Sequence, residues 1–254
     1  MPQKIKHKIF RKIRNNIPNA ITILAMCLGL TALNLSYVRS DIYLSLLLLL
    51  AAAILDAMDG RVARKLNIVS PVGAQLDSLA DFLNFCICPA LIMYEWVFKD
   101  FYFFGWFVTL IYLVAGAYRL ARFNVMYTQG AENVESKYFI GMPSPAGAIM
   151  VFAPIILTLE EHINSNHIVF KSCYVVAIAL MMASTIRTPS LKNMSLPKKY
   201  RKYAAVITIL VAGIFILEPV GSYLCAIFAY GFSIIYVNIR RQRALKKKNI
   251  VFPN

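Results

Sequence analysis

Eight long apolar segments, separated by short polar stretches, run along this 254-residue chain. A helix needs about 20 apolar residues to cross a bilayer, and most of the segments approach that length, although the seventh is short. Because the core of a bilayer holds no water, a spanning segment must satisfy its own backbone hydrogen bonds, as a helix does. The pattern therefore predicts an all-α polytopic membrane protein with about eight transmembrane helices. The segments cover approximately residues 18–37, 41–63, 72–97, 102–125, 143–160, 167–186, 203–217 and 220–238.

The distribution of Lys and Arg predicts an orientation for these helices. If the N-terminus is cytoplasmic and every segment crosses, then all 27 Lys and Arg residues except Arg39, Lys99 and Lys171 lie on the cytoplasmic side. This asymmetry agrees with the positive-inside rule and predicts a protein of the cytoplasmic (inner) membrane with both termini in the cytoplasm. The basic residues lack the interleaved aromatic side chains on which nucleic-acid bases stack. The net charge of +15 therefore indicates anionic membrane lipids as partners, and no nucleic acid.

The two ends of the chain differ from its centre. In residues 1–17, basic and apolar residues alternate and an isoleucine recurs every four residues from Ile5 to Ile17. This predicts an amphipathic helix at the membrane surface, with a merely basic tail as the alternative. Residues 240–254 form a basic tail that we expect to lie on anionic lipid. Between them, residues 18–239 form one transmembrane domain, whose last three segments we interpret as scaffold or as the surface of a homodimer.

Four carboxylates lie in the second and third apolar segments: Asp56, Asp59, Asp77 and Asp81. A charged side chain at mid-bilayer costs about 2.5–3.5 kcal/mol on insertion scales, so four of them require neutralisation. Their i, i+3 and i, i+4 spacings place each pair on one helix face, and a turn at residues 67–71 would make the two pairs face each other. Such hard oxygen ligands suit Mg²⁺ or Mn²⁺, with Ca²⁺ as another occupant. The alternative is neutralisation by Arg61, Arg64 and Lys65.

The aspartates belong to a longer motif of fixed spacing. It reads Asp56-x-x-Asp59-Gly60-x-x-Ala63-Arg64, then eight residues, then Gly73-x-x-x-Asp77-x-x-x-Asp81. This motif resembles the complete signature of the CDP-alcohol phosphotransferase family at every fixed position. Two further stretches, RLARFN at 119–124 and GMPSPAG at 141–147, are similar to the phosphatidylserine synthase branch of that family.

The resemblance implies transfer of a phosphatidyl group from CDP-diacylglycerol to L-serine, with release of CMP. It implies an Mg²⁺ or Mn²⁺ site made by the four aspartates, with Asp81 also acting as the general base that takes the proton of the serine hydroxyl. Pro18 and Asn19 are expected to open the first transmembrane helix, and Asn19 shares a helix face with Thr22. The expected ligands of CDP-diacylglycerol are Asn19, Thr22, Asp56, Gly60, Ala63, Arg64 and Gly73.

The specificity for the acceptor must come from outside the motif, because enzymes with different alcohols share it. Arg119 and Arg122 are three residues apart on one helix face, and Ser144 stands between two prolines. We expect these three residues to bind serine, since a guanidinium fork matches a carboxylate. Glycerol 3-phosphate, inositol phosphate and choline remain alternative acceptors. An ion-coupled transporter is a remote alternative, because intramembrane carboxylates also occur in transporters, although the internal repeats of such proteins are not evident here.

Overall fold

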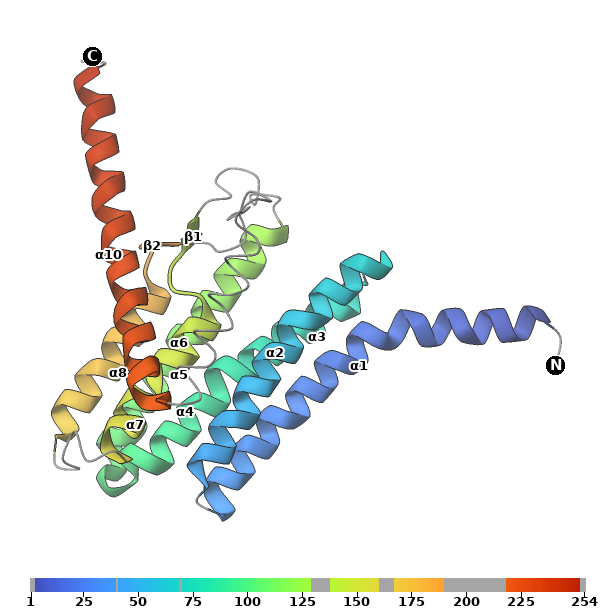
Figure 1. Cartoon of the computed structure of the whole chain (residues 1–254), viewed down its shortest axis with the longest axis horizontal. Helices are drawn as coiled ribbons and strands as arrows, with labels where there is room; N and C mark the ends of the chain where they lie inside the picture. Colours follow the sequence, from blue (N-terminus) through green and yellow to red (C-terminus); the bar gives the residue numbers. More distant parts are fainter. Residues whose placement is uncertain are drawn as a thin grey trace.

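The computed structural model describes residues 3–39, 41–68, 70–128, 138–159, 167–189 and 218–251, which are almost entirely helical (Figure 1). Short π and 3-10 segments, labelled η, interrupt the third predicted helix and separate it from the fourth. The elements are α1 (Gln3–Val38), α2 (Ile42–Leu66), α3 (Pro71–Phe82), η1 (Leu83–Ile87), α4 (Cys88–Met93), η2 (Tyr94–Phe98), η3 (Lys99–Phe101), α5 (Tyr102–Thr128), β1 (Tyr138–Ile140), α6 (Ser144–Val151), α7 (Ala153–Leu159), α8 (Ile168–Ala183), β2 (Arg187–Pro189) and α10 (Pro219–Val251).

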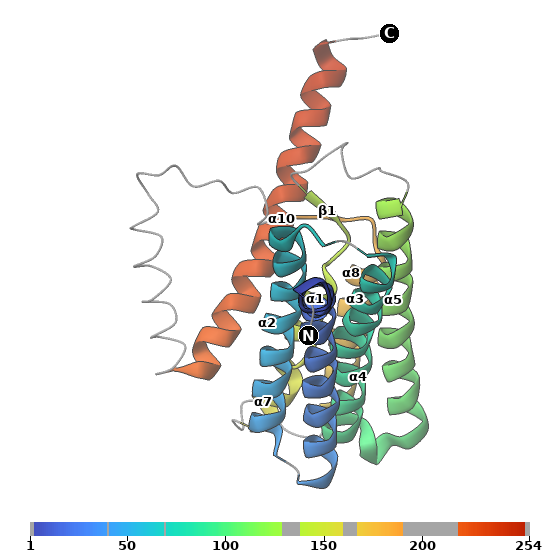
Figure 2. The same cartoon turned by 90° about the vertical axis from the view of Figure 1, so that its right-hand side faces the viewer.

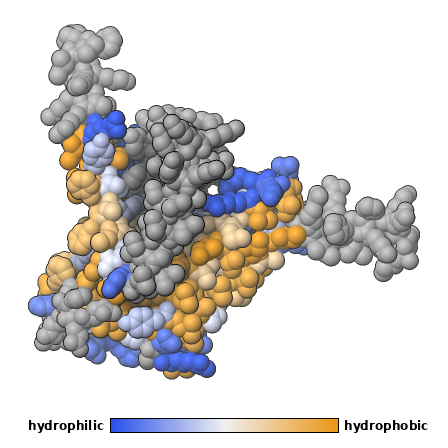
Figure 3. Space-filling view, viewed as in Figure 1, coloured by the Kyte–Doolittle hydropathy of each residue, from blue (hydrophilic) through white to orange (hydrophobic). Residues whose placement is uncertain are grey.

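Four helical stretches are long and apolar enough to cross a membrane, and two shorter ones are apolar as well. Large apolar side chains cover much of the outer surface of the helices (Figure 3), as an environment of lipid requires. The predicted integral membrane character is thus confirmed by the described residues, whereas the predicted segment 203–217 lies outside them. The four long stretches are Asn16–Val38, Ile42–Leu66, Pro71–Met126 and Val220–Arg240, and the shorter ones are Ser144–Leu159 and Ile168–Ala183.

Helices α1 and α2 form an antiparallel hairpin packed through small residues. Asp41 is the last residue of the connection between the two helices and caps α2, because its side chain accepts a hydrogen bond from the Leu44 backbone N–H (3.0 Å). Ala25 and Ala32 of α1 and Ala52 of α2 are fully buried. Such small side chains let two helix backbones approach closely in a membrane, where the hydrophobic effect does not drive helix association.

The 56-residue stretch Pro71–Met126 folds back on itself at η3, so that α5 runs antiparallel to α3 and α4. Three contacts along the hairpin establish this register. Near the turn, Gly105 packs against Phe98, because a Cβ at Gly105 would lie 2.5 Å from the Phe98 carbonyl oxygen. In the middle of the hairpin, the Tyr112 hydroxyl donates to the Phe85 carbonyl (3.0 Å). Near the other end, the Ser78 hydroxyl donates to the Asn124 side chain (3.3 Å). One π segment, η1, directly follows α3, which is typical of helices that carry functional groups.

The helix ends differ from two expectations of the sequence. The first helix does not begin at Pro18: α1 is continuous from Gln3 to Val38 and contains Pro18. Proline lacks a backbone N–H and kinks helices, and α1 bends so that its N-terminal part projects from the bundle (Figure 1). At the other end of the chain, α10 continues past residue 240 to Val251. The expected domain boundaries therefore coincide with no break in the helices.

A short two-stranded antiparallel ribbon is the one sheet among the described residues of this mostly helical fold, and its strands follow α5 and α8 in the chain. Phe139 of β1 pairs with Thr188 of β2. Gly141 follows β1 with a positive φ of 77°, where a Cβ would lie 2.8 Å from the Met182 carbonyl oxygen. Helix α10 packs on this ribbon (Figures 1 and 2). Each strand has only three residues, too few for the sequence to show a period-2 pattern.

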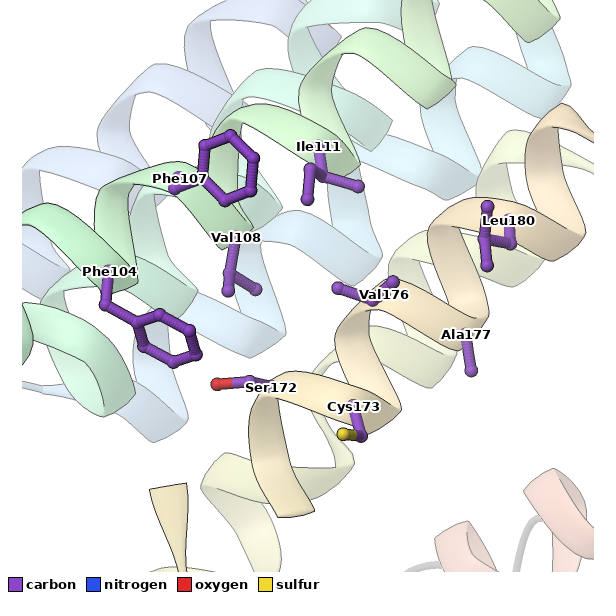
Figure 4. A pocket seen from close by; sticks show the side chains of 9 residues that line it. All are labelled: Phe104, Phe107, Val108, Ile111, Ser172, Cys173, Val176, Ala177 and Leu180. Carbon is purple, nitrogen blue, oxygen red and sulfur yellow. The ribbon is translucent and has the colours of Figure 1, made fainter. Parts of the chain in front are cut away.

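A groove of about 340 Å³ opens between α5 and α8 (Figure 4). Its lining carries no charged side chain, and among its residues only Ser172 and Cys173 bear polar atoms. Such a surface fits apolar chains and offers nothing to hold a phosphate or an amino acid. The lining residues are Phe104, Phe107, Val108, Ile111, Ser172, Cys173, Val176, Ala177 and Leu180.

Candidate active site at the carboxylate cluster

The turn between α2 and α3 brings the two aspartate pairs together, as the sequence predicts. Asn67 ends α2 in the left-handed conformation (φ 54°, ψ 42°), and its backbone N–H bonds to the last turn of the helix. Ser70 then caps α3 by accepting a hydrogen bond from the Gly73 N–H (2.9 Å), and Pro71 occupies the first turn. Asparagine tolerates the left-handed region, and Ser followed by Pro is a strong helix start.

Three of the four aspartates form a group that could hold a metal ion. Carboxylate oxygens of Asp56, Asp59 and Asp77 all lie within 4.8 Å of one another. Asp81 lies outside this group, but its carboxyl is near enough to that of Asp56 for a hydrogen bond. The Oδ1 atom of Asp56 is buried and has no hydrogen-bond partner within the described part of the chain. A buried carboxylate oxygen without a partner, facing other carboxylates, fits a hard divalent cation such as Mg²⁺ or Mn²⁺.

Neutralisation by neighbouring basic side chains, the alternative from the sequence, finds no support. No Lys or Arg nitrogen among the described side chains lies within 4.0 Å of these aspartates; the ion pair found among them joins Lys99 to Glu95. Arg64 is exposed and near enough to Asp77 to interact with it electrostatically. Among the described side chains, these carboxylates therefore have no salt-bridge partner.

Helix α1 supplies the other wall of the site, through Asn19 and Thr22. The Thr22 hydroxyl donates to Asp59 Oδ2 (2.5 Å), and both side chains are nearly inaccessible, at 4% and 3% exposure. This bond orients the carboxylate, as partners of metal ligands commonly do. Gly73 lies against Asn19, because a Cβ there would sit 3.0 Å from Asn19 Oδ1. The sequence paired Asn19 with Thr22 but gave no sign that Thr22 contacts Asp59.

The opposite side of the cluster is open. A Cβ at Gly60 would meet no atom within 4 Å, so the missing side chain leaves free space beside Asp59. Ala63, one turn further along α2, is half-buried, and Arg64 is exposed. The four motif residues outside the carboxylates thus differ in their surroundings: Gly73 permits helix packing, whereas Gly60, Ala63 and Arg64 border an accessible surface.

Arg119 and Ser144 form a buried polar pair on the other side of Asp81. Arg119 Nη1 donates to Ser144 Oγ (2.7 Å), and Arg119 is only 8% exposed while Ser144 is fully buried. The guanidinium also lies near Asp81 and stacks near the Phe123 ring, at 5.6 Å from its centroid. A buried cation is costly unless it is paired, so Arg119 is suited to receive an anionic group.

Arg122 points to a different set of partners. Its Nη1 donates to the Ala183 carbonyl (3.1 Å) and its Nη2 to the Ser184 carbonyl (2.8 Å). These bonds tie α5 to the end of α8, close to Gly141, whose missing side chain leaves room for the guanidinium. The structure therefore places Arg119 near Asp81 and Arg122 against the end of α8.

Two polar residues near Arg119 were not singled out from the sequence. Thr188 of β2 is buried, and Tyr230 of α10 lies beside both Thr188 and Arg119. One sequence feature could have drawn attention to Tyr230. The last apolar segment carries polar residues along one helix face: Tyr223, Tyr230 and Asn238. The sequence could not show which part of the bundle that face contacts.

The family model of the CDP-alcohol phosphatidyltransferases matches residues 15–186 of the chain. This range contains the whole aspartate motif, the facing residues of α1 and the Arg119–Ser144 pair. The chain belongs to this family. The fixed positions of the aspartate motif are the positions that form or border the carboxylate cluster in the structure.

Several proteins that resemble this chain carry the name CDP-diacylglycerol–serine O-phosphatidyltransferase. The protein from Mycobacterium tuberculosis is 34% identical over 233 residues, which is 90% of this chain and 80% of that protein. The protein from Helicobacter pylori is 32% identical over 84% of this chain and 88% of its own length. The protein from Bacillus subtilis is 36% identical over 70% of this chain and 93% of its own length.

Proposed function

We propose that this protein transfers the phosphatidyl group of CDP-diacylglycerol to L-serine, giving phosphatidylserine and CMP. The observation that carries the proposal is the buried Arg119–Ser144 pair next to Asp81, on one side of the carboxylate cluster of the family. The cluster suits the diphosphate of the donor, and the pair suits an acceptor with a carboxylate. The names of the similar relatives support serine as that acceptor.

The donor half of the site uses α1, α2 and α3. We assign Asp56, Asp59 and Asp77 as metal ligands, with Asp81 available to the same ion, and Mg²⁺ or Mn²⁺ as the metal. When bound, such a cation neutralises phosphate charge and stabilises the departing CMP. Arg64 would hold a phosphate from the open side of the cluster. Asn19, Thr22, Gly60, Ala63 and Gly73 complete the wall on which CDP-diacylglycerol lies.

The acceptor half uses α5 and α6. Arg119 offers its guanidinium fork to the serine carboxylate, and Ser144 holds the guanidinium in place. Arg122, the second arginine expected to bind serine, is committed to backbone carbonyls. A carboxylate at Arg122 would have to compete with those carbonyls, so Arg119 is the stronger candidate.

Asp81 stands between the two halves and is suited to act as the general base. It takes the proton of the serine hydroxyl, whose oxygen then bonds to the phosphorus that carries the diacylglycerol, while the bond from that phosphorus to the CMP oxygen breaks. Direct transfer fits the described residues, which place no His beside the cluster. Cys86, near Asp81 and Arg119, is buried against Gly116 in the helix hairpin, which leaves it no access to the donor.

The arrangement in the membrane follows from the charge asymmetry of the sequence. We propose eight spans in the cytoplasmic (inner) membrane, with both termini and the active site facing the cytoplasm, where a soluble nucleotide product can leave. Residues 1–17 and the basic end of α10 would lie on anionic lipid. We also propose a homodimer, whose interface would use exposed apolar helix surface.

The test is an assay of the purified full chain with CDP-diacylglycerol and each candidate alcohol, with Mn²⁺ or Mg²⁺ or with excess EDTA. We expect CMP release and phosphatidylserine with L-serine and metal, and none with EDTA. A preference for glycerol 3-phosphate, inositol phosphate or choline would overturn serine but not the phosphotransferase assignment. Full turnover in EDTA would overturn the metal assignment, and no CMP release with any acceptor would favour the transporter alternative.

A further inference from the structure

One face of α10 is turned toward the bundle along four turns of helix. The residues of this face, at spacings of three and four, are Tyr223, Ile227, Tyr230, Ile234 and Asn238. The two ends of the face are fixed by hydrogen bonds to other elements. The Tyr223 hydroxyl donates to the Ile149 carbonyl of α6, and Asn238 Nδ2 donates to the Arg187 carbonyl of β2 (3.0 Å). Ile234, between them, is 4% exposed.

Tyr230 lies in the middle of this face, so its side chain points inward. Its ring packs against the buried core, and its hydroxyl oxygen is buried with no hydrogen-bond partner among the residues that the structure describes. The neighbouring Thr188 hydroxyl donates its one hydrogen to the Gly141 carbonyl (2.8 Å), so it donates none to the Tyr230 oxygen. A buried hydroxyl without a partner is destabilising. In a native protein such a group commonly binds a ligand or a water molecule.

The Tyr230 hydroxyl lies among the polar groups around Arg119. Tyr230 and Arg119 are near enough to interact electrostatically, and the same guanidinium is near Asp81. Four elements therefore converge on one polar spot: α5 with Arg119, α6 with Ser144, β2 with Thr188 and α10 with Tyr230. Arg119 donates one N–H to Ser144, and a guanidinium has five N–H donors, so it retains donors for a ligand.

We propose that Tyr230 is a specificity residue of the acceptor subsite, whose hydroxyl donates a hydrogen bond to the carboxylate that Arg119 binds. This inference rests on the proposed function, because it takes an amino acid as acceptor. A carboxylate has two oxygens with about four lone pairs, enough for the guanidinium and a phenol together. Tyr230 also lies beyond residues 15–186, the part matched by the family model. Recognition of the acceptor would thus include a residue outside the domain shared by enzymes with different alcohols.

The test is Tyr230→Phe in the full-length protein, with the KM values for L-serine and for CDP-diacylglycerol measured separately. Loss of a hydrogen bond to a charged ligand group is expected to raise the serine KM roughly tenfold or more, while the KM for CDP-diacylglycerol stays unchanged. Two tyrosines of the same helix serve as matched controls. Tyr236→Phe changes an exposed side chain, and Tyr223→Phe removes a hydroxyl bound to a backbone carbonyl; neither should change the serine KM.

A second measurement separates recognition from packing. Ethanolamine is serine without its carboxylate, so its inhibition constant against serine should be the same for wild type and Tyr230→Phe if the hydroxyl binds the carboxylate. A serine KM in Tyr230→Phe equal to that of wild type would overturn the inference, as would equal losses of affinity for serine and ethanolamine. Failure of the wild-type protein to use serine at all would instead overturn the proposed function.

Discussion

At the scale of single residues, Asp81 differs from the other three carboxylates of the motif. It lies outside the group of three that could share a metal ion, and it has Asp56 on one side and Arg119 on the other. We therefore expect Asp81→Asn to lower turnover by roughly 10²–10⁴, the usual contribution of general acid–base catalysis. Binding of CDP-diacylglycerol, measured by equilibrium binding to the purified variant, should largely survive. Equal loss of binding and turnover would make Asp81 chiefly a metal ligand.

Thr22 offers a test of how the metal ligands are oriented. Thr22→Val keeps the shape of the side chain but removes the hydroxyl that donates to Asp59. Partners of metal ligands contribute about 10–100-fold to metal affinity, so the Mn²⁺ concentration for half-maximal activity should rise by about tenfold. Thr31→Val is a matched control, because its hydroxyl bonds to the Cys27 carbonyl on the same helix (2.7 Å). An unchanged Mn²⁺ requirement in Thr22→Val would show that Asp59 needs no such partner.

Replacing the two arginines of α5 should have different effects: one substitution should change the kinetics and the other the stability. Arg119→Lys keeps the charge but loses the fork, and should raise the serine KM at least tenfold with little change in the KM for CDP-diacylglycerol. Arg122→Lys should instead lower the midpoint of thermal unfolding, because its bonds to the Ala183 and Ser184 carbonyls are each worth roughly 1–3 kcal/mol. The reverse pattern, a raised serine KM only in Arg122→Lys, would exchange the two roles.

At the scale of elements, the position of α3 against α1 depends on Gly73. A Cβ there would lie 2.9 Å from Ser70 Oγ and 3.0 Å from Asn19 Oδ1. Gly73→Ala must displace the cap of α3, which costs about 0.5–2 kcal/mol, or push α3 away from α1 and shift Asp77. We expect activity to fall several-fold and the unfolding temperature to drop. Gly231→Ala, where a Cβ meets nothing within 4 Å, should instead be neutral or stabilising, since Ala is the better helix former.

The sequence predicted the elements of the donor half well, because its signals there are local. Helix spacing put each aspartate pair on one face, and the residues from Asn67 to Pro71 contain both a helix end and a helix start. The contact between Thr22 and Asp59 joins residues 37 positions apart and needs the packing of α1 on α2. The inward face of α10 likewise depends on where the last helix docks, which no local pattern encodes. The β1–β2 ribbon was missed because each strand has only three residues. The sequence suggested a helix start at Pro18, whereas α1 continues through this proline.

At the scale of the whole molecule, the proposed topology makes a prediction for labelling from outside the cell. In a variant without its native cysteines, a cysteine introduced near residue 164 should react with a membrane-impermeant thiol reagent added to intact cells. A cysteine near residue 195 should react only after the membrane is opened. The physical reason is the asymmetry of Lys and Arg between the two sides. Labelling in the reverse order would contradict the eight-span arrangement.

The order of the site residues along the chain also bears on how the protein is made. Every aspartate of the cluster, together with Thr22 and Arg64, lies within the first 81 residues, in the first three helices. Arg119, Ser144 and Tyr230 follow later in the chain. Because a chain leaves the ribosome from its N-terminus and folds in that order, the donor half can assemble while the acceptor half is still being synthesised. The growing chain therefore carries its negatively charged cluster in the membrane before Arg119, a buried cation near Asp81, has emerged.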